Sequence, residues 1–128
     1  MADDDEALIE LASKIFGFAR AGETADLVAY LDAGTPANLA NDRGDTLVML
    51  AAYHGHADTV TALLAHGADP NQANDVGQTP LAGAVFKGEN DVISALVAGG
   101  ADPNAGSPSA FEAAQMFGKD DLLSLFGN

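Results

Sequence analysis

The sequence predicts an all-α fold built from repeated helix pairs, and three observations lead to this prediction. Shifted by 33 positions, residues 41–73 match residues 74–106 at 15 of the 33 positions. Self-similarity at a fixed period indicates a stack of small units that share one continuous core. Apolar residues recur at helical spacing within each unit, and a glycine follows each apolar run.

Each complete unit contains two predicted helices. In residues 41–73 the first apolar run ends before Gly55 and the second before Gly67, so a glycine closes each helix. Thr46, and Thr79 one repeat later, stand just before the first helix, where a hydroxyl can cap an unpaired backbone N–H. The two runs are Val48, Ala51 and Ala52, then Val60, Leu63 and Leu64.

Turn-forming residues separate the units. The stretches at 41–44 (Asn-Asp-Arg-Gly) and 74–77 (Asn-Asp-Val-Gly) combine turn-favouring Asn and Asp with a glycine that can adopt positive φ. We therefore expect exposed hairpin tips between consecutive helix pairs.

These motifs resemble those of the ankyrin repeat family. The similarity rests on Gly-Gln-Thr-Pro-Leu at 77–81, Ala-Ala-Tyr-His-Gly-His at 51–56 and the Gly-Ala-Asp-Pro-Asn run at 67–71 and 100–104. The family pattern usually has a proline after the threonine and a histidine two residues later. Leu47 and Met49 replace both in one repeat, and Ala82 replaces the histidine in the other, so the hydrogen bonds of that histidine between loops should be absent.

The flanking segments match the repeat more loosely. A shift of 33 aligns Gly22 with Gly55 and predicts an N-terminal capping repeat, whereas a shift of 30 aligns Gly118 with Gly88 and predicts a C-terminal capping repeat. The three missing residues fall in the hairpin, where we expect a terminal unit to have no neighbouring hairpin to pair with. The resemblance therefore implies one ankyrin domain over residues 1–128, with approximate repeats at 6–40, 41–73, 74–106 and 107–128.

Composition narrows the functional classes. The chain has 128 residues, with 5 Lys and Arg against 19 Asp and Glu, and a net charge of −14. This acidity argues against direct binding of nucleic acid through its phosphates. Cysteine is absent, which excludes disulfides and thiolate chemistry. An acidic start and the lack of a long apolar run favour a cytoplasmic protein that does not bind membranes, and we expect a monomer.

The resemblance implies that first helices and hairpin tips line a concave, protein-binding face. The positions before the glycine between the two helices of each pair form one row of Arg20, Tyr53, Phe86 and Met116 and a second of Ala21, His54, Lys87 and Phe117. An aromatic row beside carboxylates suits a partner segment with apolar anchors and basic residues around them. The predicted partner-binding residues are Arg20, Asp42, Arg43, Asp45, Tyr53, His54, Asp75, Val76, Gln78, Phe86 and Lys87. Tyr53 and Phe86 could instead pack against neighbouring repeats.

The sequence gives little support for a catalytic or metal-binding site. The pair His54 and His56 has no clear third ligand, and His56 occupies a position that is structural in the family. No Ser or Thr has the sequence context of a nucleophile with a positioned base. We therefore predict no enzyme activity, no cofactor and no metal.

Three hypotheses remain open. The preferred one is a non-catalytic module that binds a partner protein on its concave face and regulates or stabilises it. The second is an acidic mimic that inhibits a nucleic-acid-binding protein, which would need carboxylates in a spaced stripe. The third is a small enzyme, which would need a convergent acid, base or nucleophile in a pocket.

Overall fold

The structure, a computed structural model, describes residues 2–127, and within this range helices joined by loops are its regular secondary structure, without strands. The helices are α1 (Ala2–Ala21), α2 (Thr24–Asp32), α3 (Leu47–Tyr53), α4 (Ala57–Ala65), α5 (Pro80–Lys87), α6 (Asn90–Ala98), α7 (Ala110–Met116) and α8 (Asp120–Leu125). They form four consecutive pairs, one within each predicted repeat segment, although α1 begins before residue 6.

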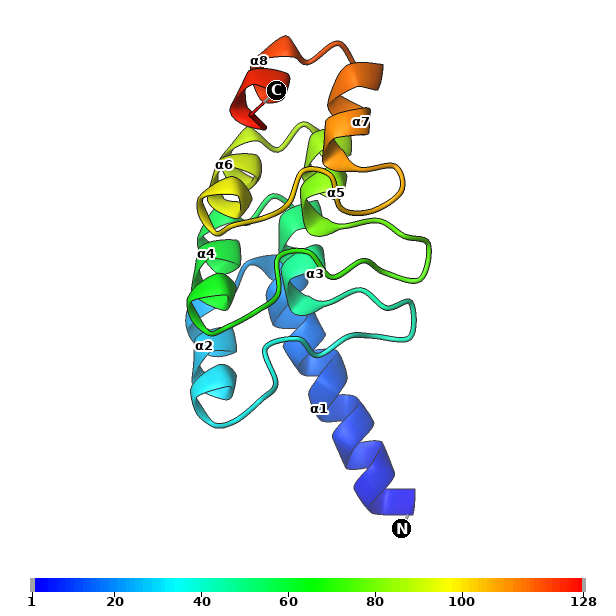
Figure 1. Ribbon diagram of the computed structural model, residues 1–128. Helices are drawn as coiled ribbons and strands as arrows, with labels where there is room; N and C mark the ends of the chain where they lie inside the picture. Colours follow the sequence, from blue (N-terminus) through cyan, green and yellow to red (C-terminus); the bar gives the residue numbers. More distant parts are fainter. Residues whose placement is uncertain (1, 128) are drawn as a thin grey trace.

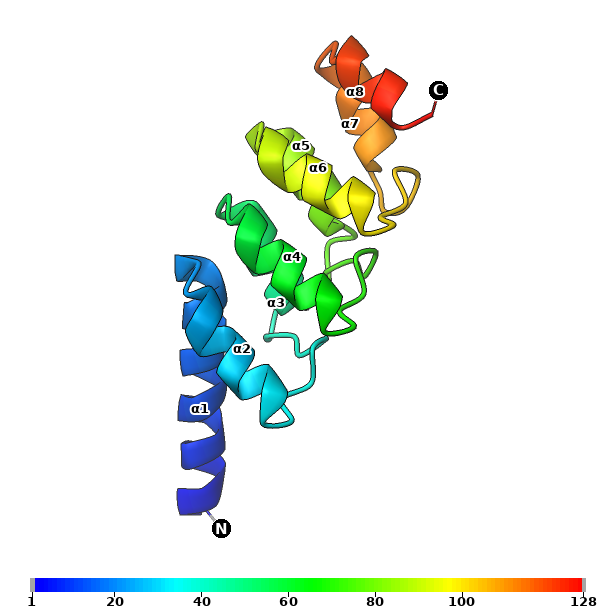
Figure 2. The same cartoon turned by 90° about the vertical axis from the view of Figure 1, so that its left-hand side faces the viewer.

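The pairs stack into an elongated solenoid. The odd-numbered helices form one column, the even-numbered helices form a second, and the hairpin loops project beyond the odd-numbered column (Figure 1). Seen from the side, each pair lies on the next in chain order (Figure 2). Helix α3 accordingly packs against α1, α4 and α5. This arrangement confirms the predicted all-α repeat solenoid.

The predicted hydroxyl caps begin the first helices. The Thr46 hydroxyl accepts a hydrogen bond from the Met49 backbone N–H at 3.1 Å, and Thr79 caps α5 in the same way. At α7, Ser109 and Glu112 form a reciprocal capping box. Each cap satisfies a backbone donor that the helix itself leaves unpaired.

The glycines between paired helices give every first helix the same end. Gly55 has a φ of +81°, a conformation that costs glycine little but strains other residues. The next N–H, of His56, then reaches the Ala51 carbonyl at 2.9 Å. The same bond recurs one repeat later from Glu89 to Ala84. The side chains just before these glycines therefore occupy equivalent positions in successive repeats.

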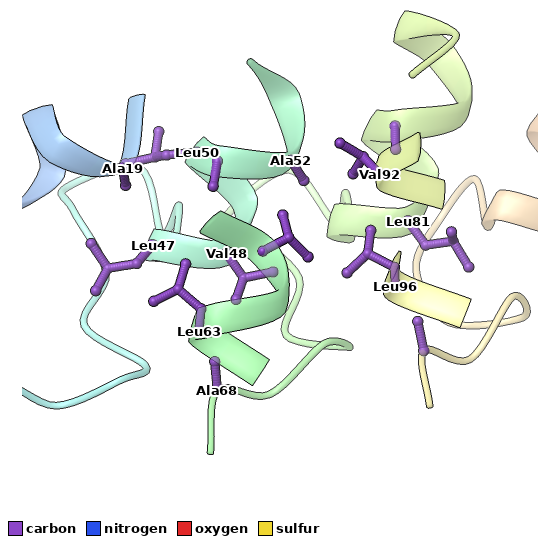
Figure 3. Packing of buried hydrophobic residues seen from close by; sticks show 14 of the residues in the cluster. Ala19, Leu47, Val48, Leu50, Ala52, Leu63, Ala68, Leu81, Val92 and Leu96 are labelled. Carbon is purple, nitrogen blue, oxygen red and sulfur yellow. The ribbon is translucent and has the colours of Figure 1, made fainter. Parts of the chain in front are cut away.

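The core runs without interruption through the stack (Figure 3). Leu63 on α4 is fully buried, as are its counterpart Leu96 on α6 and the α3 residue Val48. The small side chains of Ala51 and Ala84 are also fully buried. Because each unit completes its neighbour's core, the repeats depend on one another for stability.

The two ends of the stack differ from its middle. Helix α1 has 20 residues, and its first half projects beyond α2 and α3 (Figures 1 and 2). Leu8, Ile9 and Leu11 in this half are exposed. Among the described residues, no helix is both long enough and apolar enough to cross a bilayer.

The C-terminal hairpin, residues 99–109, is three residues shorter than the hairpin at 66–79, as predicted. The expectation that this hairpin has no neighbouring hairpin to pair with is wrong. The Ser107 N–H donates to the Gly77 carbonyl, in the preceding hairpin, at 3.0 Å. The shortened loop still reaches the preceding hairpin.

Candidate binding groove

Asparagine side chains shape the hairpins from within. The Asn41 side-chain oxygen accepts from the backbone N–H groups of Arg43 at 2.9 Å and Asp45 at 3.0 Å. Asn74 accepts in the same way from Val76 and Gln78. Each asparagine thus replaces a backbone acceptor and fixes the turn around it.

The hairpins that precede α3 and α5 are also bonded to each other. The Asn74 side-chain amide donates to an Asp45 carboxylate oxygen at 2.8 Å, and the Asp75 backbone N–H donates to the Arg43 carbonyl at 3.0 Å. These contacts join the two tips into one continuous wall beside the first helices.

A groove of about 470 Å³ lies between this wall, the end of α1 and helix α3. It is lined by Arg20, Asn41, Asp42, Arg43, Asp45, Met49, Leu50, Tyr53, His54, Asn74 and Gln78. Seven of these are predicted partner-binding residues, namely Arg20, Asp42, Arg43, Asp45, Tyr53, His54 and Gln78. The structure therefore gathers most of the predicted set around one concavity.

Four predicted residues lie outside the groove lining. Asp75 and Val76 occupy the exposed tip of the second hairpin, and Phe86 and Lys87 lie at the end of α5. These four extend the candidate surface beyond the groove, along the tips and the next first helix.

Four groove residues escaped the sequence-based prediction. From the sequence, Asn41 and Asn74 are recognised only as turn formers and Met49 only as a departure from the family pattern, and Leu50 is not singled out. Their positions in the repeat could have identified these four residues as groove candidates, because each lies next to or within a few residues of a predicted tip or row residue in the sequence. Their place in the lining depends on the distance between hairpin and helix, which the sequence does not report.

The aromatic side chains of the predicted row are partly exposed and partly packed. Tyr53 is 40% exposed and Phe86 is 38% exposed. The Lys87 ammonium lies 4.9 Å from the centre of the Tyr53 ring, and Phe86 meets Phe117 edge to face with ring centres 5.3 Å apart. Both rings therefore have neighbours within the stack and still present surface to a partner.

The histidines have different surroundings. The His56 imidazole Nε2 lies 2.7 Å from the Arg20 carbonyl oxygen and ties the start of α4 to the end of α1, which agrees with its predicted structural role. His54 lines the groove. Among the side chains that the structure describes, those of residues 5–127, no three from histidine or carboxylate residues gather as a metal site would require.

His66 joins two repeats away from the groove. Its Nδ1 lies 2.8 Å from the Ala62 carbonyl oxygen and its Nε2 lies 3.0 Å from an Asp32 carboxylate oxygen. Both partners are acceptors, so the doubly protonated imidazolium satisfies both contacts. The Ala62 carbonyl, followed by the Asp32 carboxylate, raises the pKa of His66 above its usual value.

The repeat architecture agrees with comparisons to known proteins. The sequence model of a family described as "Ankyrin repeats (3 copies)" matches residues 15–107, more than half of the chain. The chain belongs to the ankyrin repeat family. Ankyrin repeats are generally protein–protein interaction modules.

One bacterial ankyrin protein shows clear sequence similarity. Over 51 residues, the chain is 51% identical to a protein of Pseudomonas aeruginosa that carries the name ankyrin repeat protein. The match covers 40% of this chain and 30% of that relative's length. It supports the ankyrin assignment for the matched part.

Proposed function

We propose that this ankyrin stack acts by binding a segment of a partner protein in the groove and along the hairpin tips, and that it regulates or stabilises that partner without catalysis. The observation that carries the proposal is the groove itself, which seven predicted contact residues surround. Ordered tips and first helices form its walls, so little conformational freedom is lost when a partner binds.

Tyr53 in the groove lining and Phe86 on the next first helix supply apolar anchor points. Tyr53 and Phe86 follow each other at equivalent places in successive repeats and keep over a third of their surfaces exposed. Aromatic side chains are enriched at protein interfaces and often dominate binding energy. A partner segment with apolar side chains at matching intervals would cover both rings.

Carboxylates on the tips favour basic residues at the margins of that segment. Asp42 and Asp75 are exposed, one on each hairpin, and the chain carries a net charge of −14. Such a field attracts positively charged proteins and raises their association rate. We expect its contribution to fall as salt is added.

The test is affinity capture from a lysate of the source cells, with proteins identified by mass spectrometry. The wild-type chain is compared with the Tyr53→Ala/Phe86→Ala variant and with a control, Leu8→Ala/Leu125→Ala, that shortens two exposed apolar side chains outside the groove lining. A protein retained by the wild type and the control, and lost by a folded groove variant, supports the proposal.

Equal retention by all three chains would contradict the groove assignment. Capture that disappears with moderate salt, and that is insensitive to Tyr53 and Phe86, would favour the acidic mimic. Circular dichroism of each variant establishes that loss of binding is not loss of fold.

A further inference from the structure

The arginines of the groove identify the chemistry of its ligand. We infer that Arg20 and Arg43 together bind the carboxylate of an Asp or Glu side chain in the partner segment. This inference rests on the proposed function, because it names what the groove selects within that segment.

The first step concerns where the positive charges of this acidic chain lie. Of its 5 basic residues, two line this one groove. Among the others, Lys14 lies near the Phe18 ring, Lys87 lies over Tyr53 and Lys119 precedes α8. Two arginines therefore line one concavity in a chain of 128 residues with a net charge of −14.

Neither arginine is neutralised within the described chain. The ion pair found among the side chains of residues 5–127 joins His66 to Asp32, and no carboxylate oxygen of these residues approaches the Arg20 or Arg43 guanidinium within 4.0 Å. Both side chains are exposed. Each guanidinium has five N–H donors arranged to bind a carboxylate through two parallel hydrogen bonds.

The carboxylates of the groove, Asp42 and Asp45, lie on the first hairpin and do not pair with the arginines. One Asp45 oxygen accepts from the Asn74 amide at 2.8 Å, which directs that carboxylate toward the neighbouring hairpin. Asp42 lines the groove and is exposed on the first hairpin, and its carboxylate lies more than 4.0 Å from either guanidinium. The two arginines therefore face a groove in which an additional acceptor from outside can satisfy their donors.

The backbones that carry the arginines are fixed. The Arg43 N–H donates to Asn41, and its carbonyl accepts from Asp75. The Arg20 carbonyl contacts the His56 ring at 2.7 Å. Anchored backbones reduce the entropy lost when the side chains close on a ligand.

The net charge limits what kind of acidic segment can bind. Screening reduces interactions between exposed charges beyond about 8 Å at physiological ionic strength, so the arginines act locally while the distant carboxylates are damped. A segment with several consecutive acidic residues would place some of them beside the carboxylates of the hairpin tips, which would repel them. We therefore expect a single acidic residue beside an apolar anchor, in a segment that is otherwise neutral or basic.

The experiment selects peptides from a phage-displayed random dodecapeptide library on the wild-type chain. The selected sequences are synthesised with amidated C-termini, so that the only carboxylates are those of side chains. We expect Asp or Glu at one position next to an apolar residue, and replacing it by Asn or Gln should weaken binding by about tenfold or more.

Variants identify the arginines as the recognising groups. Arg20→Gln/Arg43→Gln should weaken binding of the acidic peptide by a similar factor. The variant should then bind the acidic peptide and its Asn or Gln version equally well, which a double-mutant cycle measures. The control Lys14→Gln/Lys119→Gln removes the same charge outside the groove and should preserve that advantage.

The outcomes separate this inference from the proposed function. Peptides that need Tyr53 and Phe86 but show no preference for Asp or Glu would overturn the carboxylate inference and leave the groove proposal standing. If amidation of the peptide C-terminus abolishes binding while Asp→Asn in the peptide has no effect, the bound carboxylate is a terminal one, which would contradict the inferred side-chain carboxylate. Failure to select any peptide that depends on the groove would count against both.

Discussion

The ammonium nitrogen of Lys87 lies 4.9 Å from the centre of the Tyr53 ring, across the boundary between two repeats. The two residues occupy neighbouring rows of the same face, one at the end of α3 and the other at the end of α5. The candidate face is thus held together by contacts among its own members.

Removing this contact should cost little stability. A cation over an exposed aromatic ring contributes about 0.5 to 1 kcal/mol. We predict a coupling free energy of that size in a double-mutant cycle of Tyr53→Ala and Lys87→Gln, measured by urea unfolding. Independent effects of the two substitutions would show that the contact contributes nothing, and unfolding by Tyr53→Ala alone would show that the ring belongs to the core.

The buried leucine of the second helices should be far more sensitive. Leu63 is fully enclosed between repeats, so Leu63→Ala removes buried methyl groups and leaves a cavity. We expect a loss of about 2 to 5 kcal/mol in the free energy of unfolding. The control, Leu125→Ala on the exposed side of α8, should change it by less than about 0.5 kcal/mol. Similar losses for both leucines would contradict the assigned core.

An asparagine ladder links successive repeats. The Asn71 side-chain oxygen accepts from the Asp102 backbone N–H at 2.6 Å, and Asn38 accepts from Asp69 one repeat earlier. Asn104 occupies the same motif position in the third repeat. We predict that Asn71→Ala lowers the free energy of unfolding by about 1 kcal/mol and that Asn104→Ala has a smaller effect. If Asn71→Ala and Asn104→Ala lower the free energy of unfolding equally, the loss comes from the local turn and not from the bond between repeats.

The contact between His66 and Asp32 should make stability depend on pH. Because the folded chain raises the pKa of His66 above 6.5, it holds the proton more tightly than the unfolded chain. The added stability is complete below that value and is lost as the pH rises through the folded-state pKa. The stability difference between wild type and His66→Gln should therefore be larger near about pH 5.5 than near about pH 8.5.

Nuclear magnetic resonance titration provides the direct check on His66. Asp32→Asn should lower the pKa of His66 only in part, because the Ala62 carbonyl also raises it and contributes the larger share. A wild-type His66 that titrates at its ordinary value would contradict this explanation.

Much of the fold could be predicted from short sequence motifs, because each motif occurs at matching positions in both complete repeats. Thr46 and Thr79 mark helix starts through the same capping bond, and Gly55 and Gly67 end helices through positive φ. In the last helix pair, Leu122, Leu123 and Phe126 pack against the core, whereas Leu125 is exposed. Each feature depends on a few adjacent residues and one neighbouring repeat.

Features that depend on an unrepeated segment or on exact separation were missed. A comparison with later repeats cannot reveal the added length of α1, because its first half has no counterpart there. The bond from Asn74 to Asp45 joins residues 29 positions apart and depends on how closely two hairpins approach. Met49 and Leu50 enter the groove lining for the same reason.

The most direct test of the central claim is site-specific photo-crosslinking. Because the chain contains no cysteine, a single introduced cysteine can carry a benzophenone label at one chosen position. His54→Cys places the label in the groove, and Ser94→Cys places it on the exposed side of α6, in the other helix column. The groove position should crosslink a partner protein in a lysate of the source cells, and Ser94→Cys should not. Crosslinking of that protein from position 94 alone would contradict a partner-binding groove.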